Sequence, residues 1–113
     1  KSGRCPELER SRRERLAMGA GVNSEELASI VHLRRELHRI PEIAFEEFQT
    51  SARLLSELRT VEGITIRSGM AGTGIVVDIS GDRPGPCVAL RADMDALPIT
   101  EESDLAYRST RPG

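Results

Sequence analysis

Residues 88–98 read VALRADMDALP, an apolar run that leads into Arg91, Asp93 and Asp95. In α/β sheets, ligands gather outside the carboxyl ends of strands, so these polar residues lie at a functional position if 87–90 is a central strand. Two aspartates at positions i and i+2 are also common in turns. Carboxylates suit Mg²⁺ or Ca²⁺, but two of them are too few for a closed site. From the residues alone, the stretch is a turn, a metal-adjacent pair of acids, or support for a site whose other parts lie elsewhere.

The composition predicts one small domain with an aliphatic core. The chain has 113 residues, of which 38% are hydrophobic and only 3% aromatic, with no Trp. Charged residues make up 30% and nearly balance, giving a formal net charge of −2. This balance provides no electrostatic basis for binding nucleic acid or an anionic membrane. No stretch approaches the ~20 apolar residues of a membrane span. We therefore expect neither nucleic acid nor a membrane as a partner.

The N-terminal residues 1–22 are rich in Arg and Glu and contain the sequence AMGAG near their end. Their alternating charges suit an exposed helix or a disordered arm, so we expect an extension outside a core that occupies residues 23–113. The segment lacks the apolar region of a secretory signal and begins with Lys, which predicts a chain cut or processed at its front. Cys5 and Cys87 form no Cys-x-x-Cys pair, which favours a reduced, intracellular and cytoplasmic setting.

Two helices are expected in the first half of the core. Asn23 can cap the first helix, and Glu26 three residues later completes a capping-box pattern. Apolar residues then follow at helical spacing, and Pro41 ends the helix because a proline pushes the preceding residue out of the α region. The pattern predicts a second helix that starts near residues 44–45 and runs to about Arg59.

The second half of the core reads as β structure. Short β-rich runs at 64–67, 75–79 and 87–90 predict three strands, and the third is apolar at consecutive positions, as in a strand covered on both faces. The glycine-rich loop 69–74 lies between two expected strands with no helix after it, so we interpret it as a hairpin connection rather than a nucleotide-binding loop. Two helices followed by three strands predict a layered α/β fold.

Other candidate chemical groups have simpler explanations. Glu42, Glu46 and Glu47 stand at the head of the second helix, the last two in its first turn, where the helix dipole favours acids. His32 and His38 lie six residues apart on the first helix, on different faces, and do not form the His-x-x-x-His pattern of a helical zinc site. None of these residues is assigned as a ligand or an acid–base group.

Two blocks of sequence carry a family resemblance: LRRELHRIPEIAFEEFQTS (33–51) and VALRADMDALPITEE (88–102). Over residues 27–113 the chain resembles the N-terminal part of a family of metal-dependent amidohydrolases in the zinc-peptidase clan, which includes hippurate hydrolases and plant indole-acetyl-amino-acid hydrolases. The resemblance implies the front part of a layered α/β zinc-peptidase-like catalytic domain with a two-metal site, and a smaller inserted domain that supplies homodimer contacts. It also implies an N-acyl amino acid substrate and a divalent metal, which is zinc, manganese or cobalt.

The resemblance gives Asp95 a role. In the wider clan a His-x-Asp-x-x-Pro segment ends the corresponding strand, and the Asp orients a metal-binding imidazole. Here Asp93 replaces the histidine, and Asp95 stands at the orienting position. The resemblance implies that Arg91 and Asp93 shape the strand end, where a salt bridge between them is open to test.

The resemblance also implies what the sequence lacks. In the family a His-x-Cys-Gly-His-Asp segment follows an Arg-Pro-Gly, and this chain ends at Gly113. The metal ligands and the general base would lie downstream, so we expect a fragment that binds no metal stably and is inactive alone. The alternative is a non-catalytic interaction or regulatory protein, or a truncated gene product, that keeps only the front of the fold.

Overall fold

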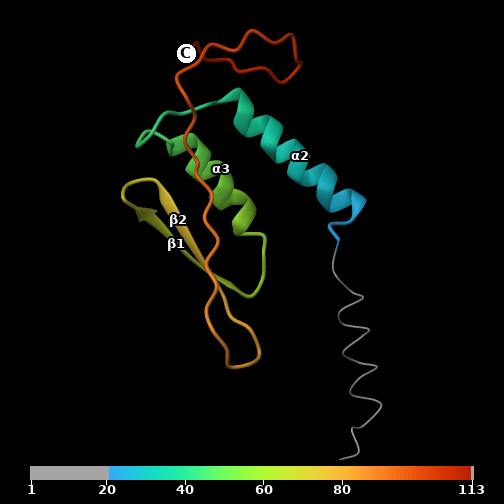
Figure 1. Ribbon diagram of the computed structural model, residues 1–113, viewed down its shortest axis with the longest axis vertical. Coiled ribbons are helices and arrows are strands. Elements are labelled where there is room, and N and C mark those ends of the chain that lie inside the picture. The colour runs from blue at the N-terminus through green and yellow to red at the C-terminus, as the bar shows by residue number, and fades with distance from the viewer. Residues whose placement is uncertain (1–20, 113) are drawn as a thin grey trace, which may run out of the picture. The chain divides into compact units, whose positions relative to one another are not determined.

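The computed structural model describes residues 21–112. In these residues the elements follow in the order α2, α3, β1, β2 (Figure 1). The chain divides into two compact units, Lys1–His32 and Leu33–Gly113, and the boundary falls within α2. Most of the extension predicted over residues 1–22 lies outside the described residues. The two helices and the strand pair confirm an α/β chain.

Helix α2 spans Ser24–Arg39 and begins with the predicted capping box. The Asn23 Oδ1 accepts hydrogen bonds from the backbone N–H groups of Glu25 (3.0 Å) and Glu26 (2.8 Å). In return, the backbone N–H of Asn23 donates to the Glu26 Oε2 at 2.9 Å. These bonds satisfy amides that have no partner within the helix, and they fix its first residue.

Helix α3 spans Phe48–Leu58, so it starts later than the sequence predicts. Phe45 adopts a left-handed backbone with φ of 68°, which no α-helix can contain. Its N–H donates to the Glu47 Oε1 at 3.0 Å, which holds this turn in place. Glu46 and Glu47 therefore precede the helix, and their predicted place in its first turn is wrong.

Strands β1 (Ile64–Met70) and β2 (Gly74–Ile79) form an antiparallel hairpin, with Ile64 opposite Ile79. The predicted hairpin connection is thereby confirmed. Gly72 has a φ of 104°, which favours glycine. A Cβ added at Gly74 would stand 2.6 Å from the Met70 carbonyl oxygen, so the backbone approaches too closely there for a larger residue.

The third strand predicted over residues 87–90 does not form. In the described part of the chain the sheet has two strands, and residues 87–90 pair with neither. A strand needs a hydrogen-bonded neighbour, and an apolar run with no neighbour stays an unpaired segment. Val88 is 81% exposed and Leu90 is 98% exposed, so the expectation that both faces are covered is also wrong.

The unit Leu33–Gly113 has little hydrophobic core. Among the described residues no hydrophobic side chain is buried, and every buried residue is polar or charged: Glu42, Glu47, Thr50, Ser51 and Thr73. These residues cluster where the start of α3 meets the hairpin turn. The predicted aliphatic core is therefore absent from the described part of the chain.

Candidate functional site

The two motif blocks of the sequence meet in space. The backbone N–H of Ala96 donates to the carbonyl oxygen of Glu42 at 2.7 Å. The Nε2 of His38 lies 2.9 Å from the Glu101 Oε2. Both contacts join residues of the block 33–51 to residues of the block 88–102. The candidate site is therefore built around the C-terminal end of α2 and the chain that follows Asp95.

A run of polar contacts fastens residues 101–111 to the end of α2. The Arg39 carbonyl oxygen accepts from the Thr110 N–H at 3.0 Å and from its hydroxyl at 2.7 Å. The Arg39 guanidinium donates to the Ala106 carbonyl at 3.0 Å, and Arg111 donates to the Pro41 carbonyl at 3.2 Å. The last carbonyls of a helix have no partner inside it, and the two contacts from Thr110 satisfy the carbonyl of Arg39, the last residue of α2. We call residues 101–111 the strap.

Glu101 is the centre of the strap. Its carboxylate accepts hydrogen bonds from the Ser103 hydroxyl and from the Ser109 backbone N–H, the latter at 2.6 Å. The hydrogen bond from Ser103, then that from Ser109, hold the pKa of Glu101 below its ordinary value, with a smaller contribution from His38. Glu101 therefore stays ionised as an acceptor for three partners.

Aromatic contacts extend this network. The rings of His38 and Tyr107 meet edge to face, with centroids 5.8 Å apart and planes at 72°. The guanidinium of Arg35 lies over the Tyr107 ring, 4.8 Å from its centroid. His38, which the sequence did not assign as a ligand, is thus held by Glu101 and Tyr107.

The acids at the head of α3 hold the fold together. Glu42 is 5% exposed, and its carboxylate accepts from the backbone N–H groups of Gln49 (3.1 Å) and Thr50 (2.7 Å). Burial by itself raises the pKa of Glu42, but these hydrogen bonds and the charge of Arg111 outweigh burial and hold the pKa below its ordinary value. The Arg111 Nη2 lies 3.7 Å from the Glu42 Oε1, so the strap also contacts the carboxylate that accepts the first amides of α3.

Glu47 joins α3 to the hairpin turn. Its Oε2 accepts from the Thr73 hydroxyl at 2.7 Å, and the Ser51 hydroxyl donates to the Thr73 carbonyl at 2.7 Å. The bond from Thr73 lowers the pKa of Glu47. The prediction that Glu42, Glu46 and Glu47 are not acid–base groups stays open, and Glu42 and Glu47 have structural roles.

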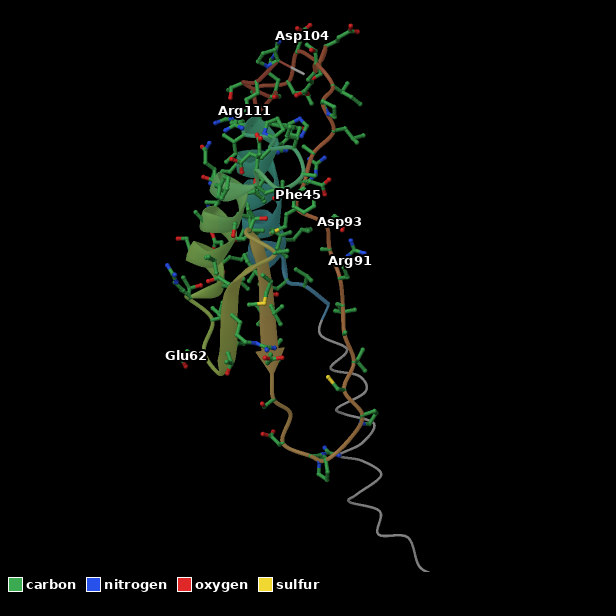
Figure 2. All side chains as sticks on the ribbon, turned by 90° about the vertical axis from the view of Figure 1, so that its left-hand side faces the viewer. Phe45, Glu62, Arg91, Asp93, Asp104 and Arg111 are labelled. Atoms are coloured by element: carbon green, nitrogen blue, oxygen red, sulfur yellow. The ribbon has the colours of Figure 1, made fainter. Side chains whose placement is uncertain are left out.

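The residues that opened the sequence lie on the unpaired segment. The Arg91 Nη2 and the Asp93 Oδ1 are 2.8 Å apart, and both side chains are exposed (Figure 2). Asp95 is also exposed and makes no hydrogen bond or ion pair with any described residue. The structure thus shows the salt bridge that was open to test, but it does not bring Asp95 to an imidazole.

The described residues do not supply a dinuclear metal site. Within residues 21–112 no group of three or more His, Cys, Asp or Glu side chains is placed to hold a metal ion. Asp93 is paired with Arg91, and His38 is paired with Glu101. A metal site that used Asp95 would therefore need ligands from outside this set.

A large hollow lies within the unit Leu33–Gly113. Its volume is about 1530 Å³, and its walls are α2, α3, β2 and the segment 87–99. Most of the lining is aliphatic, including Leu54 of α3, Val77 of β2 and Leu97 of the segment. Asp93 and Glu101 are among its charged lining residues.

Sequence reasoning missed the strap. Its contacts with α2 join residues that are 63 to 71 positions apart, as for His38–Glu101 and Arg39–Thr110. Their polar residues resemble those of any loop, and no local spacing distinguishes them. Only the knowledge that the two motif blocks meet in the folded chain would have indicated that these residues contact one another.

The chain is similar to several proteins that are named as deacetylases. It is 45% identical over 84 residues to the N-acetyl-L-cysteine deacetylase of Bacillus subtilis, covering 74% of this chain and 20% of that protein. It is 45% identical over 94 residues to the N-acetyldiaminopimelate deacetylase of Enterococcus faecalis, covering 83% of this chain and 24% of that protein. No family model matches the chain.

The chain is also similar to a solved structure. The crystal structure of the YxeP protein of Bacillus subtilis, described as a dinuclear metal binding peptidase from the M20 family, matches with a TM-score of 0.70 and 37% identity. The match covers 76% of this chain and 24% of that one. The chain thus spans about a fifth to a quarter of the length of the relatives it matches. In the described residues no helix is long and apolar enough to cross a membrane.

Proposed function

We propose that this chain forms the front part of the catalytic domain of a metal-dependent amidohydrolase, because it is similar to two deacetylases and to a dinuclear metal binding peptidase from the M20 family. The observation that carries the proposal is the 45% identity to a deacetylase over 84 residues. It is supported by the contact between the two motif blocks, through Ala96 and Glu42 and through His38 and Glu101.

The proposed substrate is a small N-acyl amino acid. Two relatives are named as deacetylases of N-acetyl amino acids, and the sequence resemblance extends the class to hippurate-like and indole-acetyl compounds. In the reaction water adds to the amide carbonyl carbon, the C–N bond breaks, and a carboxylate and a free amine form. Deacetylation and the hydrolysis of hippurate-like or indole-acetyl compounds are the same reaction on different acyl groups. The two substrate classes are therefore distinguished by which acyl group the enzyme prefers.

Divalent metal ions would supply the activated water, and zinc, manganese and cobalt are the candidates. The neighbouring dinuclear metal peptidase supports a metal in the whole protein. The part assigned to this chain is support: Asp95 orients an imidazole that binds the metal, and Arg91 and Asp93 shape the backbone before it. A homodimer and an intracellular location complete the proposal.

A chimera tests this function. The matched stretch of the B. subtilis N-acetyl-L-cysteine deacetylase is replaced by the corresponding residues of this chain, and hydrolysis of N-acetyl-L-cysteine is measured against the unmodified enzyme. We expect kcat/KM within about tenfold of the unmodified enzyme, a difference of about 1.4 kcal/mol in transition-state stabilisation. A folded chimera with full metal content and no hydrolysis would contradict the proposal.

A second observation separates the fragment from a non-catalytic protein. The DNA that follows codon 113 either continues in frame into a His-x-Cys-Gly-His-Asp sequence or contains a stop codon. The in-frame continuation supports the amidohydrolase, and the stop codon supports an interaction or regulatory protein.

A further inference from the structure

The placement of Asp95 depends on its main chain. Its side chain is exposed and makes no hydrogen bond or ion pair with any described residue. A carboxylate that orients another group must be held within about 0.5 Å of its working position, because hydrogen bonds weaken steeply outside their narrow range of distances and angles. The contact that fixes the main chain beside Asp95 therefore decides whether this residue can act.

One hydrogen bond joins this part of the main chain to other elements. Across residues 81–99 the described structure contains a single hydrogen bond to a residue outside that range. Its donor is the N–H of Ala96, the residue next to Asp95, and its acceptor is the carbonyl oxygen of Glu42, at 2.7 Å. Ala96 is half-buried, whereas Asp95 and Leu97 on either side of it are exposed. Figure 1 shows this segment, in orange, passing α3 before it reaches the strap.

Glu42 is a firmly held acceptor. The residue is 5% exposed, and its carboxylate accepts from the N–H groups of Gln49 and Thr50 at 3.1 and 2.7 Å. The Arg111 Nη2 lies 3.7 Å from the same carboxylate, and the Arg111 Nη1 donates to the carbonyl of Pro41 at 3.2 Å. The main chain on both sides of the Glu42 N–H is thus fixed by the start of α3 and by the strap.

We propose that Glu42 is a positioning residue for Asp95: its side chain is clamped by α3 and Arg111, and its carbonyl oxygen holds the Ala96 N–H, which fixes the backbone that carries the Asp95 carboxylate. Glu42 touches neither the substrate nor the reacting atoms in this scheme. The inference rests on the proposed function, because that function supplies the role of Asp95 as the carboxylate that orients an imidazole.

The competing arrangement is that the strap alone holds this segment, through the contact between His38 and Glu101. Residues 96–100 lie between Asp95 and Glu101 and contain no helix or strand. A contact at Glu101 alone would therefore leave the main chain at Asp95 free to move.

An amide-to-ester substitution tests the hydrogen bond in the deacetylase chimera. Lactic acid incorporated in place of Ala96 keeps the methyl group and removes the N–H. Nitrogen-15 relaxation in the metal-free chimera then gives the backbone order parameter of Asp95. We expect about 0.85 in the unmodified chimera and below about 0.6 in the ester variant. An order parameter that the ester does not change, or that is already low without it, would overturn the proposal.

The matched control is leucic acid in place of Leu97. The Leu97 N–H makes no backbone hydrogen bond in the described structure, so this ester should leave the order parameter of Asp95 near 0.85. Glu101→Gln tests the competing arrangement and should also leave Asp95 ordered. Release of Asp95 by Glu101→Gln but not by the ester at Ala96 would show that the strap holds the segment, and would overturn the proposal.

A double-mutant cycle shows whether the hydrogen bond acts through Asp95. The ester at Ala96 should lower kcat about fivefold, which is the worth of one ordinary hydrogen bond, and leave KM within about twofold because the bond does not involve substrate. In an Asp95→Asn background the same ester should change kcat by less than about twofold, since the residue it positions no longer acts. An equal loss in both backgrounds would show that the bond supports only the fold, and would overturn the proposal.

The relaxation measurement uses neither metal nor substrate, so the two proposals fail separately. A chimera that hydrolyses N-acetyl-L-cysteine and whose Asp95 is not released by the ester refutes the positioning role and leaves the proposed hydrolysis standing. A folded chimera without hydrolysis whose Asp95 is released refutes the proposed hydrolysis alone. If the ester variant does not fold, exchange of the Ala96 amide in the unmodified chimera decides. It should be at least about tenfold slower than that of the Leu97 amide, and equal rates would overturn the proposal. If the chimera does not fold, the same measurements are made at the matching residues of the B. subtilis deacetylase.

Discussion

The carboxylate of Glu42 accepts the backbone N–H of Thr50 at 2.7 Å, so helix α3 is capped by a side chain that lies outside the helix. The residue at the ordinary cap position, Glu47, makes no such bond and instead accepts from Thr73. Glu42 can serve here because the left-handed turn at Phe45 folds the chain back toward the first turn of α3. The glutamate of the Pro-Glu pair in the first motif block, Glu42, thus has a structural role as the cap of α3.

Replacing Glu42 by alanine should loosen the start of α3. Loss of a capping side chain costs about 1 kcal/mol, which makes the Thr50 amide exchange about five times faster with solvent. Amide exchange followed by NMR measures the effect at this residue. Glu46→Ala is the matched control, because Glu46 is an exposed glutamate that also precedes α3. An equal effect of the two substitutions would show that Glu42 is not the cap.

The same cap should depend on pH. The pKa of Glu42 is lowered in the folded chain, because its hydrogen bonds and Arg111 outweigh the opposing effect of burial. A lowered folded pKa contributes stability that is present above the ordinary pKa of 4.5 and is lost as pH falls through the folded pKa. We expect protection of the Thr50 amide to be constant near neutral pH and to fall in the acid range below that value. Protection that does not change on acidification would contradict this assignment.

The strap should detach when Glu101 loses its charge. Glu101→Gln removes an ionised acceptor from His38, Ser103 and Ser109, so the Ser109 amide should exchange faster and the His38 ring should lose its contact with Tyr107. NMR shifts of the His38 ring and exchange at Ser109 follow both events. Glu102→Gln is the control, because Glu102 is exposed. Unchanged His38 shifts in Glu101→Gln would rule out the His38–Glu101 contact as the attachment of the strap.

The described structure shows why part of this fold was readable from sequence. The capping box at Asn23, the hairpin loop and the two helices depend on neighbours within a few residues, and each was predicted. The start of α3 was not, because it depends on the backbone of Phe45 and on a carboxylate eight residues before Thr50. Local pattern carries no information about such a distant acceptor.

The site was harder to predict for the same reason. Contacts such as His38–Glu101 join residues far apart in the chain, and an isolated Glu in a loop has no distinguishing pattern. The third strand over 87–90 was expected because its apolar run describes a covered strand. An apolar run indicates that a segment is suited to burial, but it does not show whether a neighbouring strand is present to pair with it. In the described residues no strand pairs with residues 87–90.

The isolated chain should unfold without a sharp transition. No hydrophobic side chain is buried among the described residues, and cooperative unfolding depends mainly on burial of apolar surface. We expect a broad loss of circular dichroism signal on heating and a tendency to aggregate through the open edge of β2. A sharp two-state melt of a monomer at high temperature would contradict this expectation.

Asp95 should matter for metal binding in the chimera. Asp95→Asn removes the negative charge proposed to orient an imidazole, and loss of such a partner lowers metal affinity or activity by about 10- to 100-fold. Zinc affinity and kcat/KM are both measured. Asp104→Asn is the control, since Asp104 is exposed and lies in the strap (Figure 2). An unchanged affinity for Asp95→Asn would remove this residue from the site.

Metal content and hydrolysis in the deacetylase chimera test the central claim most directly. The account predicts that the purified chimera binds two equivalents of zinc or manganese and hydrolyses N-acetyl-L-cysteine, whereas the isolated 113-residue chain does neither. A folded, metal-loaded chimera without hydrolysis would contradict the claim that this chain serves as the front of an amidohydrolase. Two bound metal ions and hydrolysis by the isolated chain would contradict the claim that the ligands lie outside it.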